Sequence, residues 1–516
     1  MSIPIHRFAI MVLSCLWVII VMAFFYVLRG HGDASGWPAN AVHNWNQYGF
    51  GALHGKLVTN PGGFAVLTNP EIYSGHSAVS YYPVFATGLV LGWLGDGILI
   101  YHLIFSLALF LSVWFLLGRG QLAWICAFAA LLCPGYSIYP TVVDPNAVAL
   151  YMTLPFAAVV VFILTGHCIS PLRLTFLAVV VFAYTSLNWS TLLGHGILFC
   201  ALLVMPAVSW RRLGIYIALA SLSGGVVGSL AVIEKMGLSA GHAGAGHFLD
   251  FLAGYTWGQT GYGVDLTTNK AILRLSVVNC IGLFPLLGFI AWFLVKFRYA
   301  DPRKDMLAFL PLLGSISGIM TMRNYFGHHP WMATPMLLPG LVLSLVLLLR
   351  PRVNESDGSK HSFVGWKYIV CCFFYALMVL AAFRLYQADS LEVASFVCQH
   401  TDRSDIIAVA KNLDPEMSRQ ADYLSEKCDR HLVVLDDLKN PPIDGGNVFL
   451  LSAARLPSQY LMIAQSKKPS LLSMPLVRDL SAFYAQKIAR RNAEDRHFDY
   501  TANATFCLYR LPSRVH

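Results

Sequence analysis

Charged residues are scarce in this chain, making up only 12% of its 516 residues. A soluble globular protein carries about 25% charged residues, so this composition excludes that class. Hydrophobic residues make up 56% of the chain instead. We therefore expect an integral membrane protein whose surroundings are a lipid bilayer.

Signatures of several other protein classes are also missing. The net charge of +9 comes from basic residues spread over short loops, not from one patch that would hold nucleic acid. The chain has no CxxC pair, no internal repeat and no phosphate-cradling GxxxxGK[ST] loop. His242 and His247 have no third ligand nearby, so we expect no metal site there, and the sequence names no cofactor.

Long apolar runs take the place of charge in the first 386 residues. A membrane helix needs about 20 mostly apolar residues. Eleven runs meet this criterion within a few residues: 8–28, 97–117, 121–138, 147–165, 173–188, 192–209, 213–233, 273–295, 306–322, 331–349 and 364–386. The first run has no small-residue cleavage site after it, so we expect it to remain as a helix.

Basic residues fall in alternate loops between these runs, and such loops face the cytoplasm. They are Arg7, Arg119, Arg173, Arg211 and Arg212, and the basic stretches 296–304 and 350–367. The N-terminus is therefore predicted to be cytoplasmic. The loops predicted to lie outside are 29–96, 139–146, 189–191, 234–272 and 323–330, together with everything after residue 387.

Two stretches of the first outside loop are apolar or aromatic without being spans. Residues 84–94 are too short to cross, and counting them as a span would put the later basic loops outside. We expect a re-entrant or interfacial helix there. Residues 40–54 are amphipathic and aromatic, so we expect a second helix along the membrane surface.

The composition changes after residue 386, which divides the chain into a membrane domain, 1–386, and a smaller domain, 387–516. Apolar runs shrink to strand length at 406–409, 432–435 and 448–451, with helix-like stretches at 414–426 and 456–466. This alternation predicts a small α/β domain. An odd number of spans places it outside the cytoplasm, in the periplasm, where two of Cys398, Cys428 and Cys507 can form a disulfide.

Two acidic residues near the outer surface are the first candidates for catalysis. Asp33 lies just after the first run, where hydrocarbon meets water and a carboxylate is well placed to act on a lipid-borne substrate. Gly32-Asp33 also suits a turn. Asp144 lies in the second outside loop, and carboxylates from separate loops can converge over the membrane. Asp144-Pro145 equally suits a helix start, with Asp as N-cap and Pro at N1.

Aromatic residues of the outside loops are candidates for substrate binding. His76, Tyr81 and Tyr82 place an imidazole and two aromatic rings beside the 84–94 helix, although such rings also form interfacial belts. In the loop 234–272, Trp257 and Tyr262 lie among hydroxyls and glycines, a mixture suited to sugar contacts. Glycine-rich loops are also common as hinges.

A basic corner of the loop 323–330 is a candidate phosphate site. Arg323 interrupts the positive-inside pattern, which points to an anionic partner, and His328 and His329 add donors. Phosphate suits this set because the guanidinium presents a planar fork of donors. Lys270 is an alternative phosphate partner, or an ordinary contact for lipid headgroups.

In their order along the chain, these features resemble the GT-C superfamily of membrane glycosyltransferases. Within it, the chain looks like the protein O-mannosyltransferases and the aminoarabinose transferases that act on lipid A. The resemblance rests on the Asp33 loop, the surface stretch ending at 45–50, His76 with 81–83, the Gly118-Arg119 turn, and 144–146. The resemblance in motifs covers residues 1–165. The rest of the chain resembles the family only in its architecture. Ala34 and His76-Ser77-Ala78 stand where many members carry Glu and His-Pro-Pro.

The resemblance implies that a sugar moves, with inversion, from a polyprenyl-phosphate-linked donor to an acceptor hydroxyl at the outer face of the cytoplasmic membrane. Asp33 would be the general base and Asp144 would orient the acceptor or support Asp33. Arg323, His328 and His329 would stabilise the charge that grows on the leaving phosphate. The acceptor can be a protein, a lipid or a glycan, and the sequence names neither the sugar nor the lipid carrier.

Other classes of membrane protein stay open as alternatives. A polytopic transporter needs ionisable residues that face the bundle interior, whereas most of those here lie at the ends of the runs. An O-antigen ligase or polymerase of cell-envelope glycan assembly typically carries its important residues in a large late loop. Here the acidic loop comes early.

Overall fold

The computed structural model covers the whole chain and describes a little under half of it. The described segments are 5–29, 41–59, 72–73, 78–91, 94–118, 121–138, 144–164, 171–188, 190–204, 306–322, 332–349, 369–381, 395–402, 405–410, 431–435, 447–452, 461–465 and 507–511, with a few single positions between them. Contacts divide the chain into two compact units. The first consists of Met1–Val27, Ser74–Thr87 and Gly95–Met378, and the second of Leu28–Tyr73, Gly88–Leu94 and Val379–His516. These units have other bounds than the predicted domains, 1–386 and 387–516, which stay a prediction.

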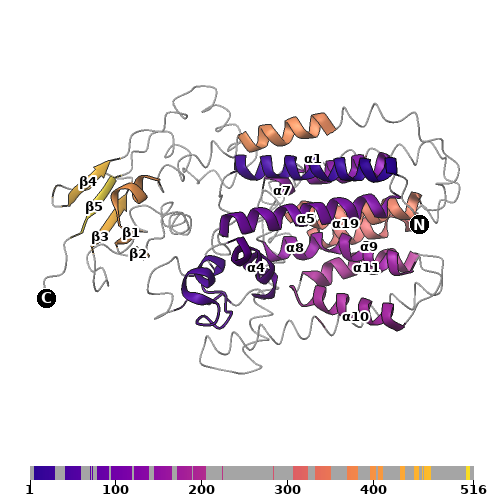
Figure 1. Ribbon diagram of the computed structural model, residues 1–516, viewed down its shortest axis with the longest axis horizontal. Helices are drawn as coiled ribbons and strands as arrows, with labels where there is room; N and C mark the ends of the chain where they lie inside the picture. The colour runs from indigo at the N-terminus through magenta and orange to yellow at the C-terminus, as the bar shows by residue number, and fades with distance from the viewer. Residues whose placement is uncertain are drawn as a thin grey trace. The chain divides into compact units, whose positions relative to one another are not determined.

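Helices make up nearly all of the described residues before position 382 (Figure 1). They are α1 (Ile5–Arg29), η3 (Ala78–Tyr81), α4 (Tyr82–Leu91), α5 (Leu94–Leu116), α6 (Gln121–Leu131), α7 (Pro134–Ser137), α8 (Pro145–Tyr151), α9 (Thr153–Leu164), α10 (Pro171–Thr185), α11 (Thr191–Val204), α17 (Leu310–Thr321), α19 (Ala333–Leu349) and a further helix at Ile369–Ala381. Each apolar run that lies in the described part of the chain is therefore helical.

Three of the described helical stretches are long and apolar enough to cross a bilayer: Phe8–Val27, Ile98–Leu116 and Pro145–Phe162. Shorter apolar helices occur at Ala78–Val90, Pro171–Thr185, Thr191–Val204, Leu310–Thr321, Ala333–Leu348 and Ile369–Ala381. The runs 213–233 and 273–295 lie almost entirely outside the described residues. The count of eleven spans therefore stays a prediction.

Large apolar side chains point outward from these helices as well as inward. Trp17 on α1 is 58% exposed and Phe176 on α10 is 56% exposed. A bilayer accommodates apolar side chains that point outward from apolar helices, whereas water does not. These helices indicate a membrane environment for the first unit.

The predicted run 121–138 is not one helix. It breaks at Cys133, which is the N-cap of α7, and Pro134 follows at N1. Proline cannot continue a preceding helix because it lacks an N–H and its ring clashes with the turn before it. The run 147–165 likewise begins two residues early at Pro145, and α8 and α9 meet at Met152.

The end of α1 and the early turns of α5 lie together. The rings of Tyr26 and His102 are 6.0 Å apart between centroids. The connection between these helices therefore leaves and returns at the same end of the first unit. This agrees with the prediction that 84–94 does not cross the membrane, and α4 is a helix of only 10 residues.

Helices α17 and α19 pack at close range through small residues. A Cβ added at Gly340 would lie 2.7 Å from the carbonyl oxygen of Pro311 and 3.0 Å from Cα of Leu312. The backbone N–H of Leu312 also donates to Oγ of Ser344, at 3.3 Å. Small residues allow membrane helices to approach until their backbones touch.

The stretch predicted to be a surface helix at 40–54 is helical from 41 to 49 and then turns. A helical turn over 41–44 leads into the π-helix η2 (Trp45–Gly49). The chain then folds back, because Asn44 Nδ2 donates to the Val58 carbonyl at 2.9 Å and the Trp45 indole donates to the Lys56 carbonyl at 2.6 Å. Trp45 is buried in this fold.

The second unit contains a five-stranded mixed sheet with the strand order β2-β1-β3-β5-β4. Strands β1 (Ile406–Ala410), β2 (His431–Leu435) and β3 (Val448–Ser452) are parallel to one another. Strands β4 (Leu461–Gln465) and β5 (Cys507–Arg510) complete it in antiparallel pairing. The three strands predicted at 406–409, 432–435 and 448–451 are confirmed as β1, β2 and β3.

The prediction of a helix-like stretch at 456–466 is wrong. Residues Leu461–Gln465 form β4, which pairs with β5. Leucine, methionine and alanine favour a helix locally, but backbone pairing with a neighbouring strand overrides so weak a preference in a run of five residues. The stretch predicted at 414–426 lies outside the described residues.

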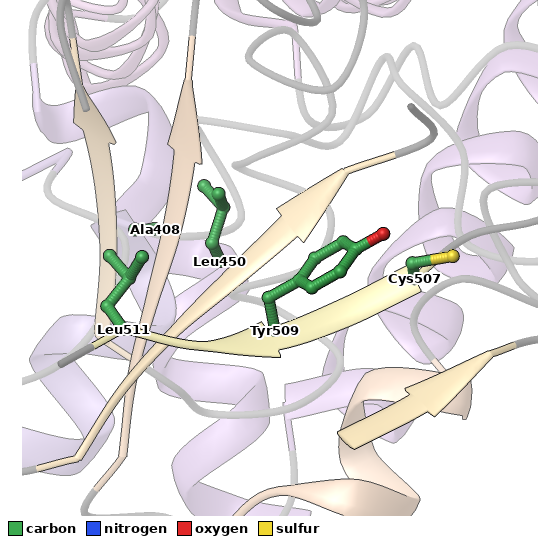
Figure 2. Close-up of a cluster of buried hydrophobic side chains, with 5 residues drawn as sticks. All are labelled: Ala408, Leu450, Cys507, Tyr509 and Leu511. Carbon is green, nitrogen blue, oxygen red and sulfur yellow. The ribbon is translucent and has the colours of Figure 1, made fainter. Parts of the chain in front are cut away.

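The core of the sheet is a small apolar cluster (Figure 2). It consists of Ala408, Leu450, Cys507, Tyr509 and Leu511. The Tyr509 hydroxyl accepts a hydrogen bond from the backbone N–H of Leu456 at 3.0 Å. Cys507 is a free buried thiol, whereas Cys398 is disulfide-bonded. The prediction that two of Cys398, Cys428 and Cys507 pair agrees with these two observations, and Cys428 lies outside the described residues.

Candidate functional site

Polar side chains from three connecting segments meet around the start of α8. Ser80 of η3 donates from Oγ to the carbonyl of Leu187 at 2.6 Å. Asn188 donates from Nδ2 to Oδ1 of Asn146 at 3.0 Å, and Ser190 donates from Oγ to the Asn146 carbonyl at 3.5 Å. We call Ser80, Asn146, Asn188 and Ser190 the polar junction.

The polar junction joins segments that the sequence places in, or next to, three predicted outside loops, 29–96, 139–146 and 189–191. All four side chains are buried, although the surrounding helices are apolar. Buried polar groups in such helices need hydrogen-bond partners, and here the partners come from different loops. The junction therefore fixes these connections to one another at one end of the first unit.

Asp144 is held next to the junction as the N-cap of α8. Its Oδ1 accepts from the backbone N–H groups of Asn146 at 2.9 Å and Ala147 at 3.2 Å. Pro145 follows at N1, and the backbone of Asp144 is extended (φ −88°, ψ 114°). The helix start that Asp144-Pro145 suited is thus present, and it fixes a half-buried carboxylate beside Asn146.

Two substitutions of Asp144 should separate its cap from its charge. Asparagine caps a helix as well as aspartate does, whereas alanine at an N-cap costs about 0.5–2 kcal/mol. We expect Asp144→Ala to lower the thermal unfolding temperature of the purified protein and Asp144→Asn to leave it unchanged. A loss of stability as large with asparagine as with alanine would mean that the carboxylate charge, not the cap, holds this region.

The two tyrosines predicted to bind substrate differ in exposure. Tyr81 is 1% exposed and directly follows Ser80 of the polar junction, so it belongs to the packing of the first unit. Tyr82 begins α4 and is 37% exposed. Partial burial raises the pKa of the Tyr82 phenol above its ordinary value, so at neutral pH the group keeps its proton and can donate a hydrogen bond.

The remaining predicted site residues lie outside the described part of the chain. They are Asp33, His76, Trp257, Tyr262, Lys270, Arg323, His328 and His329. Arg323 comes two residues after α17 ends, and α19 begins ten residues after it. Helix α19, which follows Arg323 in the chain, contacts both α7 and α8.

A row of aromatic rings inside the first unit was not predicted. It runs from Tyr26 on α1 to His102 on α5, then to Tyr136 on α7 and Tyr151 on α8. The last two steps are 5.7 and 5.0 Å between ring centroids. Tyr136 also shares a 2.6 Å hydrogen bond with Ser106. The row ties the outgoing end of α1 to α8, one to two turns from Asp144.

A second buried histidine was also missed. His195 on α11 is 4% exposed, and its ring makes T-shaped contacts with the rings of Phe156 and Tyr184, whose centroids lie 5.2 and 4.8 Å from its own. His102 and His195 both stand within long apolar runs, and an ionisable residue there is the sequence signal that would have found them.

No protein-family model, no curated protein and no solved structure matches this chain. Among the residues that the structure describes, no three His, Cys, Asp or Glu side chains gather to hold a metal ion.

Proposed function

We propose that this protein is a membrane glycosyltransferase. It moves a sugar from a polyprenyl-phosphate-linked donor to an acceptor hydroxyl at the outer face of the cytoplasmic membrane, with inversion at the anomeric carbon. The observation that carries the proposal is the polar junction, because it joins three predicted outside loops around a capped carboxylate, Asp144. The GT-C-like order of motifs in residues 1–165 supports the same reaction.

Asp33 is the proposed general base. An acceptor hydroxyl must lose its proton as its oxygen attacks the anomeric carbon, and a carboxylate within hydrogen-bond reach takes that proton. The bond that breaks joins the anomeric carbon to the phosphate oxygen of the donor. The electron pair leaves with the polyprenyl phosphate, whose negative charge therefore grows and requires cationic donors. Arg323, His328 and His329 are proposed for that role, with Lys270 as the alternative.

Arg323→Ala should raise the donor concentration needed for half-maximal transfer by roughly tenfold to a hundredfold. A charge-assisted hydrogen bond to phosphate contributes about 1.5–3 kcal/mol, which corresponds to that range. Donor titrations with the wild type and the variant measure it. Arg173→Ala on α10 is the matched control, since that exposed arginine belongs to a predicted cytoplasmic loop. An unchanged donor dependence would remove Arg323 from the phosphate site.

The proposed topology has eleven spans, a cytoplasmic N-terminus and a periplasmic C-terminal domain. The disulfide at Cys398 supports the location of that domain, because structural disulfides persist in oxidising compartments. The second compact unit groups Leu28–Tyr73 with Val379–His516, two stretches that the charge pattern assigns to the outside. Both observations agree with one outer side for the Asp33 loop and the C-terminal domain.

Reconstitution tests the reaction directly. The full chain in proteoliposomes would receive a polyprenyl-phosphate-linked sugar with a radioactive label, together with a protein, a lipid A or a glycan acceptor. Transfer of label to one acceptor class would identify the substrate. Absence of transfer to all three, with protein that stays folded, would contradict the proposal.

A second candidate function is a polytopic transporter, which His102 and His195 favour. Ionisable residues buried between membrane helices often mark routes for protons or substrates. Uptake of solute into vesicles, driven by a proton gradient and lost when either histidine is replaced, would favour the transporter. An O-antigen ligase or polymerase would instead transfer a whole lipid-linked glycan chain in the reconstituted assay.

A further inference from the structure

His195 is a buried histidine whose ring nitrogens, Nδ1 and Nε2, make no hydrogen bond. A neutral imidazole carries one donor and one acceptor. Leaving both unsatisfied in an apolar interior is unfavourable, and such a group in a native protein calls for an explanation.

The surroundings of His195 combine aromatic rings with hydroxyl groups. The rings of Phe156 and Tyr184 make T-shaped contacts with the imidazole. The Tyr184 hydroxyl shares a 2.7 Å hydrogen bond with Oγ1 of Thr153 and donates to the Ala149 carbonyl at 2.7 Å. Gly194, next to His195, lets these hydroxyls reach the α11 backbone, since a Cβ there would collide with Thr153 and Tyr184.

One polar side chain, Thr191, lies between His195 and the polar junction on α11. Thr191 donates from Oγ1 to the carbonyl of Asn188, a member of the junction, at 2.6 Å. Thr191 and His195 are four residues apart on α11, so they share one face of the helix. The rise of an α-helix puts His195 only about 6 Å further along the axis. The imidazole therefore lies one turn beneath the junction.

We propose that His195 is a binding residue for a hydroxyl of the lipid-borne sugar, in a subsite one helical turn beneath the polar junction. This inference rests on the proposed function and names a further part of its donor site. A sugar hydroxyl donates and accepts, which matches the two nitrogens of a neutral imidazole. The residues in ring contact with His195 are uncharged, which favours a neutral hydroxyl over the phosphate. The aromatic rings of Phe156 and Tyr184 and the hydroxyl groups of Tyr184 and Thr153 lie around the imidazole, a mixture of apolar and polar groups like that of a sugar.

The test compares His195→Leu with His195→Gln in the full-length protein purified in detergent. Thermal unfolding is followed against two lipids, a polyprenyl-phosphate-linked sugar and bare polyprenyl phosphate. Without lipid, His195→Leu should be at least as stable as the wild type, because it removes two unsatisfied polar atoms. It should bind the sugar-bearing lipid about tenfold more weakly and the bare lipid equally well. His195→Gln, which keeps a donor and an acceptor, should recover part of the affinity.

Any other outcome of this comparison would contradict the proposed sugar subsite at His195. Equal binding of the sugar-bearing lipid by His195→Leu would show that no sugar contact was lost. Equal weakening for both lipids would assign His195 to the phosphate or the tail, and a lower stability without lipid would assign it to packing. His400→Leu, at an exposed histidine of the second unit, controls for the substitution itself. A wild-type protein that binds neither lipid would overturn the proposed function, and the subsite with it.

Discussion

Asp33→Asn is expected to abolish sugar transfer while the protein stays in the membrane at its normal level. Asparagine has the shape of aspartate but cannot take the proton of the acceptor hydroxyl. Loss of a general base lowers a rate by about 10²–10⁴-fold. The measurement is the initial rate of transfer from a labelled polyprenyl-phosphate sugar, with the amount of membrane-inserted protein determined in parallel.

Asp144→Asn is the natural comparison for that experiment. Both substitutions remove one negative charge from a predicted outside loop, and asparagine at residue 144 retains the helix cap. If the two variants lose transfer equally with intact stability, both carboxylates act in the reaction. Normal transfer by Asp33→Asn would remove the base from the proposed mechanism, and the glycosyltransferase assignment would lose its central residue.

Gly340→Ala is expected to destabilise the protein strongly. The added Cβ would meet Oγ of Ser315 and, at 2.7 Å, the carbonyl oxygen of Pro311. Two of its three nearest atoms belong to the α17 backbone, so no rotation of a flexible side chain relieves the clash. Overpacking of this kind costs about 1–3 kcal/mol.

Gly196→Ala on α11 is the matched control. A Cβ there meets nothing within 4 Å, and alanine is favoured over glycine in a helix by up to about 1 kcal/mol. The two substitutions add the same methyl group to apolar helices and should move the unfolding temperature in opposite directions. Thermal unfolding in detergent measures both. A stable Gly340→Ala protein would show that α17 and α19 are not packed backbone to backbone.

Much of the helical structure can be predicted from the length of the apolar runs alone. The runs 8–28 and 97–117 become α1 and α5 within three residues at each end, because one long apolar stretch leaves few alternatives to a helix in a bilayer. The helix break at Cys133-Pro134 could also have been predicted, because proline marks a helix boundary. A hydropathy average taken over a window of residues does not detect it. Strand β4 could not be predicted from its own sequence, because it forms by pairing with β5, which lies some 45 residues away.

The candidate site was harder to predict than the fold. The sequence singled out Asp144 but left open whether it capped a helix, and only the positions of the Asn146 and Ala147 amides resolve that point. His195 escaped notice because a single imidazole in an apolar run gives no spacing to match. Its significance depends on what surrounds it, and Tyr184 and Thr153 come from different helices.

The hydrogen bond between Ser80 and Leu187 has a consequence for biogenesis. Its two partners are 107 residues apart, so the ribosome must add that many residues before the Ser80 hydroxyl can meet its carbonyl. At common elongation rates this takes roughly 5–20 s, far longer than a helix needs to form. The Ser80 hydroxyl therefore lacks this partner until α10 and the turn after it have been synthesised.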